Sequence, residues 1–404
     1  MKKLKNALIG QSGGPTAVIN ASLAGAITEY LSNENCSTLY GAVNGIKGVL
    51  REEFLNLNEV FSDKSKIDLL MQTPSSYLGS CRYRLSKEND DEIEKIVSIL
   101  QKNDIGYFFY IGGNDSMDTV MRLSKICHSN GIKAIGIPKT IDNDLVGTDH
   151  CPGYGSSAKY IATAISEMAL DAGCYDIKNV LIVEIMGRNA GWLAASSALA
   201  RTTSSTAPDL IYLPEKVFDD EKFLYDIRQK LLHQDTVVVA VSEGIKYSNG
   251  NYVAQSTSES KKDMFGHSQL GGVCKKLEHL VKNRLGIKVR GVELNLPQRC
   301  ASHNASDTDI NEAFKCGEFA VKCALEGESG KMIAMNRADG SEYDISYSAL
   351  DISNIANSEK IVPDSFINAD RNDVTDEFIK YALPLIQGER NIIFENGIPA
   401  YIKR

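Results

Sequence analysis

Short apolar segments alternate with longer amphipathic segments along most of the chain. The apolar segments are four to eight residues long and rich in Val, Ile, Leu and aromatic residues, which predicts buried strands. They lie at 6–10, 38–43, 105–111, 132–137, 179–186, 210–213, 236–242 and 287–294. Helical spacing of apolar residues predicts helices at 16–32, 90–102, 116–130, 156–173, 190–201, 219–233, 268–285 and 306–325.

The segment 156–173 illustrates the helical pattern. Ile161 and Ile165 are four residues apart and lie on one face, and Ser156 or Ser157 is expected to cap the start of the helix. The alternation of strands and helices predicts an α/β fold with parallel sheets and helices on both faces. A length of 404 residues predicts two domains. The last 75 residues are less regular, and we interpret them as a C-terminal extension packed on the domains.

Composition narrows the class of protein. Hydrophobic residues make up 43% of the chain and charged residues 24%, which is typical of a soluble globular protein. The net charge of -8 argues against general binding to nucleic acid or to anionic membranes. The nine cysteines form no CxxC pair, and no apolar run is long enough for a signal peptide or a membrane span. We therefore expect a cytoplasmic protein with reduced thiols.

The loops that follow the strands are the candidate site, because parallel sheets bind ligands at the carboxyl ends of their strands. In the loop GQSGGP, residues 10–15, small residues would let phosphate oxygens approach backbone N–H groups beside a helix start. It matches neither GxxxxGK[ST] nor GxGxxG, and a plain tight turn is the alternative. The loop GGNDS, residues 112–116, is also suited to phosphate, yet Asp115 carries the same sign of charge as a phosphate.

The segment PKTIDNDL, residues 138–145, carries the most specific pattern. Asp142 and Asp144 are two apart, so in an extended segment both project from the same face. Such a pair suits phosphoryl transfer, in which one carboxylate holds a metal and the other removes a proton from a hydroxyl. Lys139 is placed to meet a phosphoryl group. Asp-Asn-Asp also forms turns, but the neighbouring lysine and strand favour catalysis.

Four further loops carry charged residues. LGSCRYR contains Arg82 and Arg84, for which the alternative is an exposed surface loop. MGRNAGW places Arg188 in a glycine turn suited to phosphate or sugar hydroxyls, and SEGI places Glu243 at a strand end, as a sugar contact or a helix cap. Finally, Arg290 and Arg299 lie at the two ends of the segment RGVELNLPQR and could clamp a terminal phosphate.

Taken in order, these loops resemble those of the phosphofructokinase family over roughly residues 4–325. GGPTAVIN resembles the family's first phosphate turn, LGSCR its arginine loop, GGNDS its GGDG-type loop and PKTIDND its TIDxD loop. MGR and EG resemble its sugar-phosphate contacts, and NLPQR resembles its later QR motif. The resemblance implies two Rossmann-like three-layer α/β domains with parallel-rich sheets and the active site in the cleft between them. The first domain would comprise residues 1–150 and about 298–345, and the second residues 151–297 and about 346–404.

The resemblance also implies phosphorylation of the 1-hydroxyl of fructose 6-phosphate to give fructose 1,6-bisphosphate. Asp142 would be the general base, and Thr140 would lie beside the transferring group. Gly13, Gly14 and Arg82 would face the donor phosphates.

Further contacts follow from the same resemblance. The sugar phosphate would be bound by Met186, Gly187, Arg188, Glu243, Arg290 and Arg299. Arg290 would come from a neighbouring subunit, so a homodimer or homotetramer is expected. Mg²⁺ would be held by Asp144, Asp115 and Asn114, although relatives often have an aspartate at position 114. Ala24 and Thr28 replace effector-site arginines, so little allosteric control is expected.

The choice of phosphoryl donor depends on two positions. ATP-dependent members usually have Gly at the positions of Asp115 and Lys139, whereas pyrophosphate-dependent members have Asp and Lys. Asp115 would fill the space of the α-phosphate of ATP and repel it, because two like charges about 4 Å apart cost roughly 4 kcal/mol at an effective dielectric of 20. Lys139 would supply positive charge to the leaving phosphate.

These positions favour pyrophosphate as the donor, with an ATP-dependent phosphofructokinase as the alternative. A non-catalytic subunit that binds sugar phosphate is a further alternative, but such a subunit would be expected to lose the base, and Asp142 is present. The sequence does not distinguish a dimer from a tetramer, or one direction of the reaction from the other.

Overall fold

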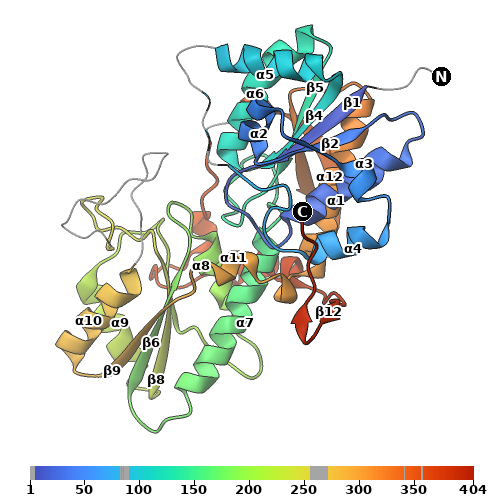
Figure 1. Ribbon diagram of the computed structural model, residues 1–404. Helices are drawn as coiled ribbons and strands as arrows, with labels where there is room; N and C mark the ends of the chain where they lie inside the picture. Colours follow the sequence, from blue (N-terminus) through green and yellow to red (C-terminus); the bar gives the residue numbers. More distant parts are fainter. Residues whose placement is uncertain are drawn as a thin grey trace.

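The computed structural model describes residues 5–81, 83, 85, 91–254, 272–340, 342–355 and 358–404. The described chain forms two α/β lobes, each built around its own sheet (Figure 1). All eight strands expected from the hydrophobic pattern are present, with ends within two residues of the predicted ones. The predicted α/β class with parallel-rich sheets is therefore confirmed.

The larger sheet has seven strands in the order β11-β10-β5-β4-β1-β2-β3. The strands are β1 (Asn6–Gln11), β2 (Leu39–Ala42), β3 (Phe54–Asn56), β4 (Ile105–Gly112), β5 (Lys133–Pro138), β10 (Lys331–Arg337) and β11 (Ile345–Asp351). The pairs from β2 to β10 are parallel, and β3 and β11 are antiparallel strands at the two edges. The parallel strands at its centre carry the near-continuous apolar runs typical of a sheet covered on both faces.

Both faces of the larger sheet are covered by helices. Ile9 and Phe109 belong to one hydrophobic core, while their neighbours Leu8 and Phe108 belong to the other. The first core is covered mainly by α1 (Ile19–Ser32), α4 (Ser65–Gln72) and α12 (Asp307–Leu325), and the second by α2 (Gly45–Arg51), α5 (Asp91–Lys102) and α6 (Asn114–Ser129). The short helix α3 (Leu57–Val60) lies beside β2. This lobe therefore has three layers.

The smaller sheet has four parallel strands in the order β7-β8-β6-β9. They are β6 (Asn179–Ile185), β7 (Leu210–Tyr212), β8 (Thr236–Ser242) and β9 (Lys288–Glu293). The helices of this part are α7 (Tyr154–Ala172), α8 (Trp192–Ser196), α9 (Asp220–Lys230), α10 (Val273–Leu285), α11 (Pro297–Cys300) and α13 (Asp376–Ala382). Two further cores lie on opposite faces of this sheet, so it too is the middle of three layers.

The predicted cap of α7 was wrong. The helix begins at Tyr154, so Ser156 and Ser157 lie inside its first turn. The carboxylate of Asp309, from α12, accepts hydrogen bonds from the N–H groups of Gly153 (2.8 Å) and Ser156 (2.9 Å). A carboxylate supplied by a distant helix thus satisfies the free N–H groups, which local sequence does not reveal.

The interpretation of the last 75 residues as an extension was wrong in part, because β10 and β11 complete the larger sheet. β11 reaches Asp351, beyond the predicted boundary near 345. The hairpin of β12 (Phe394–Glu395) and β13 (Ile398–Pro399) returns to the larger lobe, where Gln72 donates to the carbonyl oxygen of Ile393 at 3.0 Å. The predicted division into domains stays a prediction, and these contacts differ from it at the C-terminal end.

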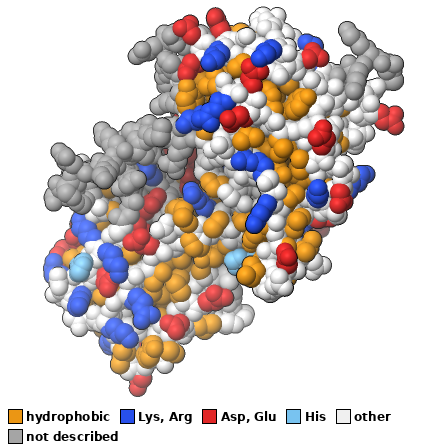
Figure 2. Space-filling model, viewed as in Figure 1, with side chains coloured by type: hydrophobic (Ala, Val, Ile, Leu, Met, Phe, Trp, Pro, Cys, Tyr) orange, Lys and Arg blue, Asp and Glu red, His pale blue; other side chains and the backbone are white. Residues whose placement is uncertain are grey.

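Short 3-10 helices complete the described elements: η1 (Ser197–Ala200), η2 (Ser302–Asn304), η3 (Ile352–Asn354), η4 (Asp364–Phe366) and η5 (Leu383–Ile386). Within the described residues, no helix combines the length and apolar character needed to cross a membrane. On the face seen in Figure 2, basic and acidic side chains are interspersed over both lobes.

Candidate active site

A cavity of about 790 Å³ lies where loops from both sheets meet. Its lining includes residues from the loops after β1, β4 and β5 of the larger sheet and after β6, β8 and β9 of the smaller sheet. Every one of these loops leaves the carboxyl end of a parallel strand. The cavity therefore lies where open α/β sheets bind their ligands.

Twelve of the predicted site residues line this one cavity: Gly13, Gly14, Asn114, Asp115, Lys139, Thr140, Asp142, Asp144, Met186, Arg188, Glu243 and Arg299. Gly187 and Arg290 are not among its lining residues. Arg82 and Arg84 lie outside the described residues.

Lys139 lies against the first glycine loop. Its ammonium donates a hydrogen bond of 2.7 Å to the carbonyl oxygen of Gly14, and a Cβ at Gly13 would lie 3.3 Å from the ammonium nitrogen. The residue is only 4% exposed. Burial lowers the pKa of Lys139 to about 8, although Asp142 and Asp144 oppose this shift. The ammonium is therefore mostly protonated at neutral pH, and it lies beside the glycine loop suited to phosphate.

The loop after β5 is held by polar contacts on both sides. Thr140 N–H donates to the carbonyl oxygen of Pro152 (3.2 Å), and the Thr140 hydroxyl accepts from Asp142 N–H (3.0 Å). Asn143 has a left-handed backbone (φ 53°), and its side-chain oxygen accepts from Cys151 N–H at 3.0 Å. The segment is thus not extended as the sequence suggested, yet Asp142 and Asp144 both line the cavity. The turn at Asn143 produces this geometry.

The pKa values of the two carboxyl groups in this loop, those of Asp142 and Asp144, are raised. Burial, followed by the negative charges of Asp144 and Glu243, raises the pKa of Asp142 to about 7. Burial also raises the pKa of Asp144, against the hydrogen bond from Thr140. A carboxyl group with a pKa near neutral is suited to take a proton from a hydroxyl at physiological pH.

The start of α6 offers oxygen ligands for a metal. The side-chain oxygen of Asn114 is buried and has no hydrogen-bond partner. Its amide nitrogen lies 3.4 Å from a carboxylate oxygen of Asp144. Asp115 is exposed at the cavity surface in the first turn of the helix. An unpartnered carbonyl oxygen beside a carboxylate fits Mg²⁺, which prefers oxygen ligands.

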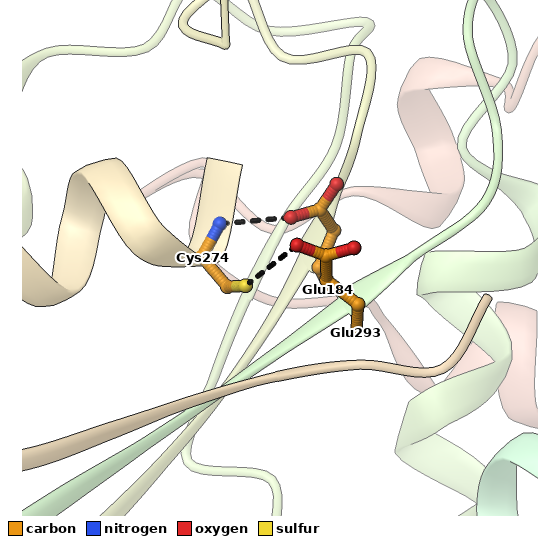
Figure 3. A group of neighbouring side chains, drawn as sticks. All are labelled: Glu184, Cys274 and Glu293. Carbon is orange, nitrogen blue, oxygen red and sulfur yellow. Dashed lines mark hydrogen bonds between the residues drawn. The ribbon is translucent and has the colours of Figure 1, made fainter. Parts of the chain in front are cut away.

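A second group of possible metal ligands has a different explanation. Glu184, Cys274 and Glu293 offer ligand atoms within 4.8 Å of one another (Figure 3). However, the carboxylate of Glu184 accepts hydrogen bonds from the N–H groups of Gly272 (3.2 Å) and Cys274 (2.9 Å) at the start of α10. None of the three lines the cavity. Glu184 therefore acts as a cap for α10.

On the smaller-sheet side, Glu243 is tied to the glycine turn after β6. A carboxylate oxygen of Glu243 accepts from Gly187 N–H at 3.3 Å, and burial raises the pKa of this carboxyl group. No described helix begins at Glu243, so its interpretation as a helix cap was wrong. Gln298, which the sequence interpretation left without a role, accepts from Met186 N–H at 3.1 Å. The turn is thereby braced from both sides.

The two arginines near β9, Arg290 and Arg299, lie in different places relative to the cavity. Arg299, on α11, reaches across to the first glycine loop, where a Cβ at Gly14 would lie 3.4 Å from its guanidinium. Arg290 lies on the edge strand β9, its side chain is 69% exposed, and its guanidinium is 4.0 Å from Asp171. Arg299 thus faces the cavity of its own chain, whereas Arg290 faces away from it.

Sequence reasoning did not include Glu359 among the lining residues. It lies in the polar stretch that follows β11, where no periodicity or motif distinguishes one acidic residue from its neighbours. Leu296 also lines the cavity and is 51% exposed.

Comparisons with known proteins agree with this geometry. The phosphofructokinase family model matches residues 6–292. Proteins named pyrophosphate–fructose 6-phosphate 1-phosphotransferase from Methylococcus capsulatus and Xanthomonas campestris are 40% and 41% identical to the chain, and in each case the match covers 98% of this chain and 95% of the relative. A crystal structure of pyrophosphate-dependent phosphofructokinase from Marinobacter aquaeolei matches with a TM-score of 0.88 at 38% identity, covering 98% of this chain and 95% of the other.

Proposed function

The chain belongs to the phosphofructokinase family, and we propose that it transfers a phosphoryl group reversibly between pyrophosphate and O1 of fructose 6-phosphate. The products of the forward reaction are fructose 1,6-bisphosphate and phosphate. One phosphoanhydride is exchanged for one phosphoester, so both directions are accessible to the enzyme. The reaction would serve glycolysis or gluconeogenesis.

One observation carries this proposal. Asp115 and Lys139, the two residues that favour pyrophosphate over ATP, line the same cavity as Asp142. Asp115 is exposed to the cavity, where its charge would meet an approaching nucleotide, and the Lys139 ammonium is buried beside the first glycine loop. The same site would thus exclude the longer donor and bind the shorter one.

Asp142 is the proposed general base. Its carboxylate would accept the proton of the 1-hydroxyl as that oxygen attacks the nearer phosphorus of pyrophosphate in line. The raised pKa of Asp142 makes it a stronger base than an exposed aspartate. Thr140, whose hydroxyl accepts from Asp142 N–H, would hold this carboxylate beside the transferring group.

The cations of the site would stabilise the phosphoryl groups. Lys139 would neutralise charge on the leaving phosphate, together with backbone N–H groups of Gly13 and Gly14. Arg82 is proposed from the sequence to face the donor phosphates.

Mg²⁺ is the proposed cofactor, held by Asn114, Asp115 and Asp144. When bound, it would offset the negative charge of pyrophosphate. The unpartnered oxygen of Asn114 supports this assignment, because it leaves a ligand position that no protein donor occupies.

Fructose 6-phosphate would bind on the smaller-sheet side of the cavity. Met186, Gly187, Arg188 and Glu243 form the turn and carboxylate that would contact the sugar, and Arg299 would bind its 6-phosphate. Arg290 would reach the 6-phosphate in a neighbouring subunit, which makes the proposed active form a homodimer or homotetramer.

An assay of the purified chain tests the proposal. Turnover of fructose 6-phosphate is measured with Mg²⁺ and either pyrophosphate or ATP as donor, and the reverse reaction is measured with phosphate and fructose 1,6-bisphosphate. We expect pyrophosphate to support turnover in both directions and ATP to support little. Faster turnover with ATP would overturn the donor assignment, and no turnover with either would favour a non-catalytic subunit.

A further inference from the structure

Residues 358–362 form hydrogen bonds with both lobes, and we refer to them as the crosspiece. On the larger-sheet side, Lys360 N–H donates to the carbonyl oxygen of Asp144 at 2.8 Å. On the smaller-sheet side, the carbonyl oxygen of Lys360 accepts from the indole N–H of Trp192 at 2.9 Å, and Val362 N–H donates to Glu215 at 3.0 Å. The crosspiece therefore connects the catalytic loop to elements of the other lobe.

The side chain of Lys360 adds a second connection on the catalytic side. Its ammonium donates to the carbonyl oxygens of Asp149 (2.7 Å) and Thr148 (3.2 Å). It also lies 5.1 Å from the centre of the Trp192 ring, within the range of a cation–π contact. One residue thus contacts the segment that follows β5 at three carbonyl oxygens and holds the crosspiece against Trp192.

These contacts bear on the reacting groups. The carbonyl oxygen of Asp144 belongs to the same residue whose carboxylate lines the cavity, and Asp142 is two residues away. The neighbouring Asn143 has a left-handed backbone, so the loop depends on external contacts to keep its shape. The residue before Lys360, Glu359, lines the cavity. A displacement of the crosspiece would therefore move groups on two sides of the site.

We propose that Lys360 is a positioning residue, which fixes the catalytic loop through the carbonyl oxygens of Asp144, Thr148 and Asp149. This inference rests on the proposed function, because it concerns how Asp142 and Asp144 are held for phosphoryl transfer. Lys360 acts through these residues and is not assigned a contact with substrate.

The test compares Lys360→Met with Lys360→Arg and with a matched control, Lys216→Met. Methionine keeps the apolar length of the side chain but removes the ammonium, whereas arginine keeps the charge and the donors. The ammonium of Lys216 pairs with exposed Asp364 at 2.7 Å, and neither residue belongs to the loop after β5. Lys216→Met therefore removes a lysine ion pair without disturbing the loop after β5.

For Lys360→Met we expect kcat to fall by about 10- to 100-fold, because a displacement of about 1 Å at reacting groups can cost that much. The KM for fructose 6-phosphate should change less than about twofold, and the Mg²⁺ concentration for half-maximal activity should rise, since Asp144 is displaced. Lys360→Arg should recover much of the activity, and Lys216→Met should match the wild type.

Two readouts do not require activity. Trp192 is the only tryptophan, so its fluorescence reports on the crosspiece directly. We expect Lys360→Met, and not Lys216→Met, to change the Trp192 emission and to speed amide hydrogen exchange in residues 142–149. Should Lys360→Met fail to fold, Trp192 emission and hydrogen exchange in residues 142–149 of Lys360→Arg test the proposal instead. We expect both to change in the same direction as in Lys360→Met, but by less.

Unchanged kcat, Mg²⁺ dependence and hydrogen exchange in Lys360→Met would overturn the proposal. Equal losses in Lys360→Met and Lys216→Met would also overturn it, because they would indicate a general loss of stability. If the wild type lacks pyrophosphate-dependent activity while hydrogen exchange still rises in Lys360→Met, the proposed function fails and the positioning role stands.

Discussion

At the scale of single residues, the donor site combines two features with opposite energetic consequences. The buried ammonium of Lys139 is costly to keep charged away from water, as its lowered pKa shows. In the proposed reaction, bound pyrophosphate would offset that cost by bringing negative charge to Lys139. Asp115 keeps its carboxylate exposed to the cavity, where it imposes a cost on any donor that extends toward it.

The double variant Asp115→Gly, Lys139→Gly should therefore shift the donor preference from pyrophosphate toward ATP. We expect kcat/KM for pyrophosphate to fall by about 100-fold or more, because the leaving phosphate loses a charged partner. We expect kcat/KM for ATP to rise, because space and charge no longer oppose the α-phosphate. Steady-state kinetics with both donors measure the two changes.

Asp115→Asn serves as the control that separates charge from size. If repulsion is the main obstacle to ATP, this variant should gain much of the ATP activity of Asp115→Gly. Pyrophosphate activity that survives the double substitution intact would contradict the roles given to both residues.

His150 is a buried group whose charge affects stability. Its ring nitrogens lie 2.8 Å from Asp149 and 2.6 Å from Glu312, and the side chain is 1% exposed. Burial alone would lower the pKa of His150, but Glu312 and Asp149 raise it to about 9 from an ordinary value of 6.5. The stabilisation is therefore fully present below about pH 6.5 and is lost as the pH rises through about 9.

We expect this loss to be on the order of 3 kcal/mol in the free energy of unfolding. Denaturant unfolding of the wild type and of His150→Gln, measured from pH 6 to pH 9.5, isolates the effect of His150 and its two carboxylate partners, because titrating groups elsewhere contribute equally to both proteins. A stability difference between the two proteins that stays constant over this range would show that folding does not raise the pKa of His150.

At the scale of elements, the crossing of α1 and α12 depends on two glycines. A Cβ at Gly317 would lie 1.9 Å from the carbonyl oxygen of Ser22, and one at Gly25 would lie 1.9 Å from that of Phe314. The helices are thus in direct backbone contact. α12 also carries Asp309, which caps α7, so this crossing connects the larger lobe to the first helix of the smaller one.

Gly317→Ala should destabilise the fold by about 1–3 kcal/mol, because an added methyl group must push the two helices apart. Urea unfolding monitored by circular dichroism measures the change. Gly340→Ala is the control, since a Cβ there would meet no atom closer than 4.0 Å. Equal stability of the two variants would show that the helices separate at little cost.

Eight strands were predicted from the apolar runs that burial on both faces leaves in strands such as β4 and β8. β10 was missed although its centre is buried and carries such a run. β11 was missed because it is an edge strand whose residues are only partly buried and include polar side chains. The group that caps α7 could not be predicted for another reason. Asp309 is more than 150 residues from Ser156 in the chain, so no local pattern connects the two.

The residues of the site likewise divide into those that could be predicted from the sequence and those that could not. Residues in loops that directly follow strands, such as Asp142 and Glu243, were predictable because the fold class fixes where those loops meet. Glu359 and Lys360 come from a segment without a pattern, and only the folded chain brings them to the catalytic loop. The side-chain role of Gln298 likewise depends on a contact with Met186 that no spacing reveals.

At the scale of the whole molecule, the cavity of a single chain contains one of the two arginines expected at the 6-phosphate. Arg299 lines it, whereas Arg290 lies on the exposed edge of the smaller sheet. An exposed edge strand is a suitable place for another subunit to approach. The position of Arg290 is therefore consistent with the proposal that it binds the 6-phosphate in the active site of a neighbouring subunit.

Mixed oligomers of Asp142→Asn and Arg290→Ala test this arrangement. Each variant alone should be nearly inactive, because every site lacks either its base or its second arginine. In a random one-to-one mixture, a site is complete when its own subunit carries Asp142 and its neighbour carries Arg290, so about a quarter of the sites should be intact. Activity of the mixture, prepared by co-expression or by unfolding and refolding together, should therefore recover to about a quarter of the wild-type value. If Arg290 acted in its own chain, no combination of the two variants would produce a complete site, and the mixture would stay as inactive as its components.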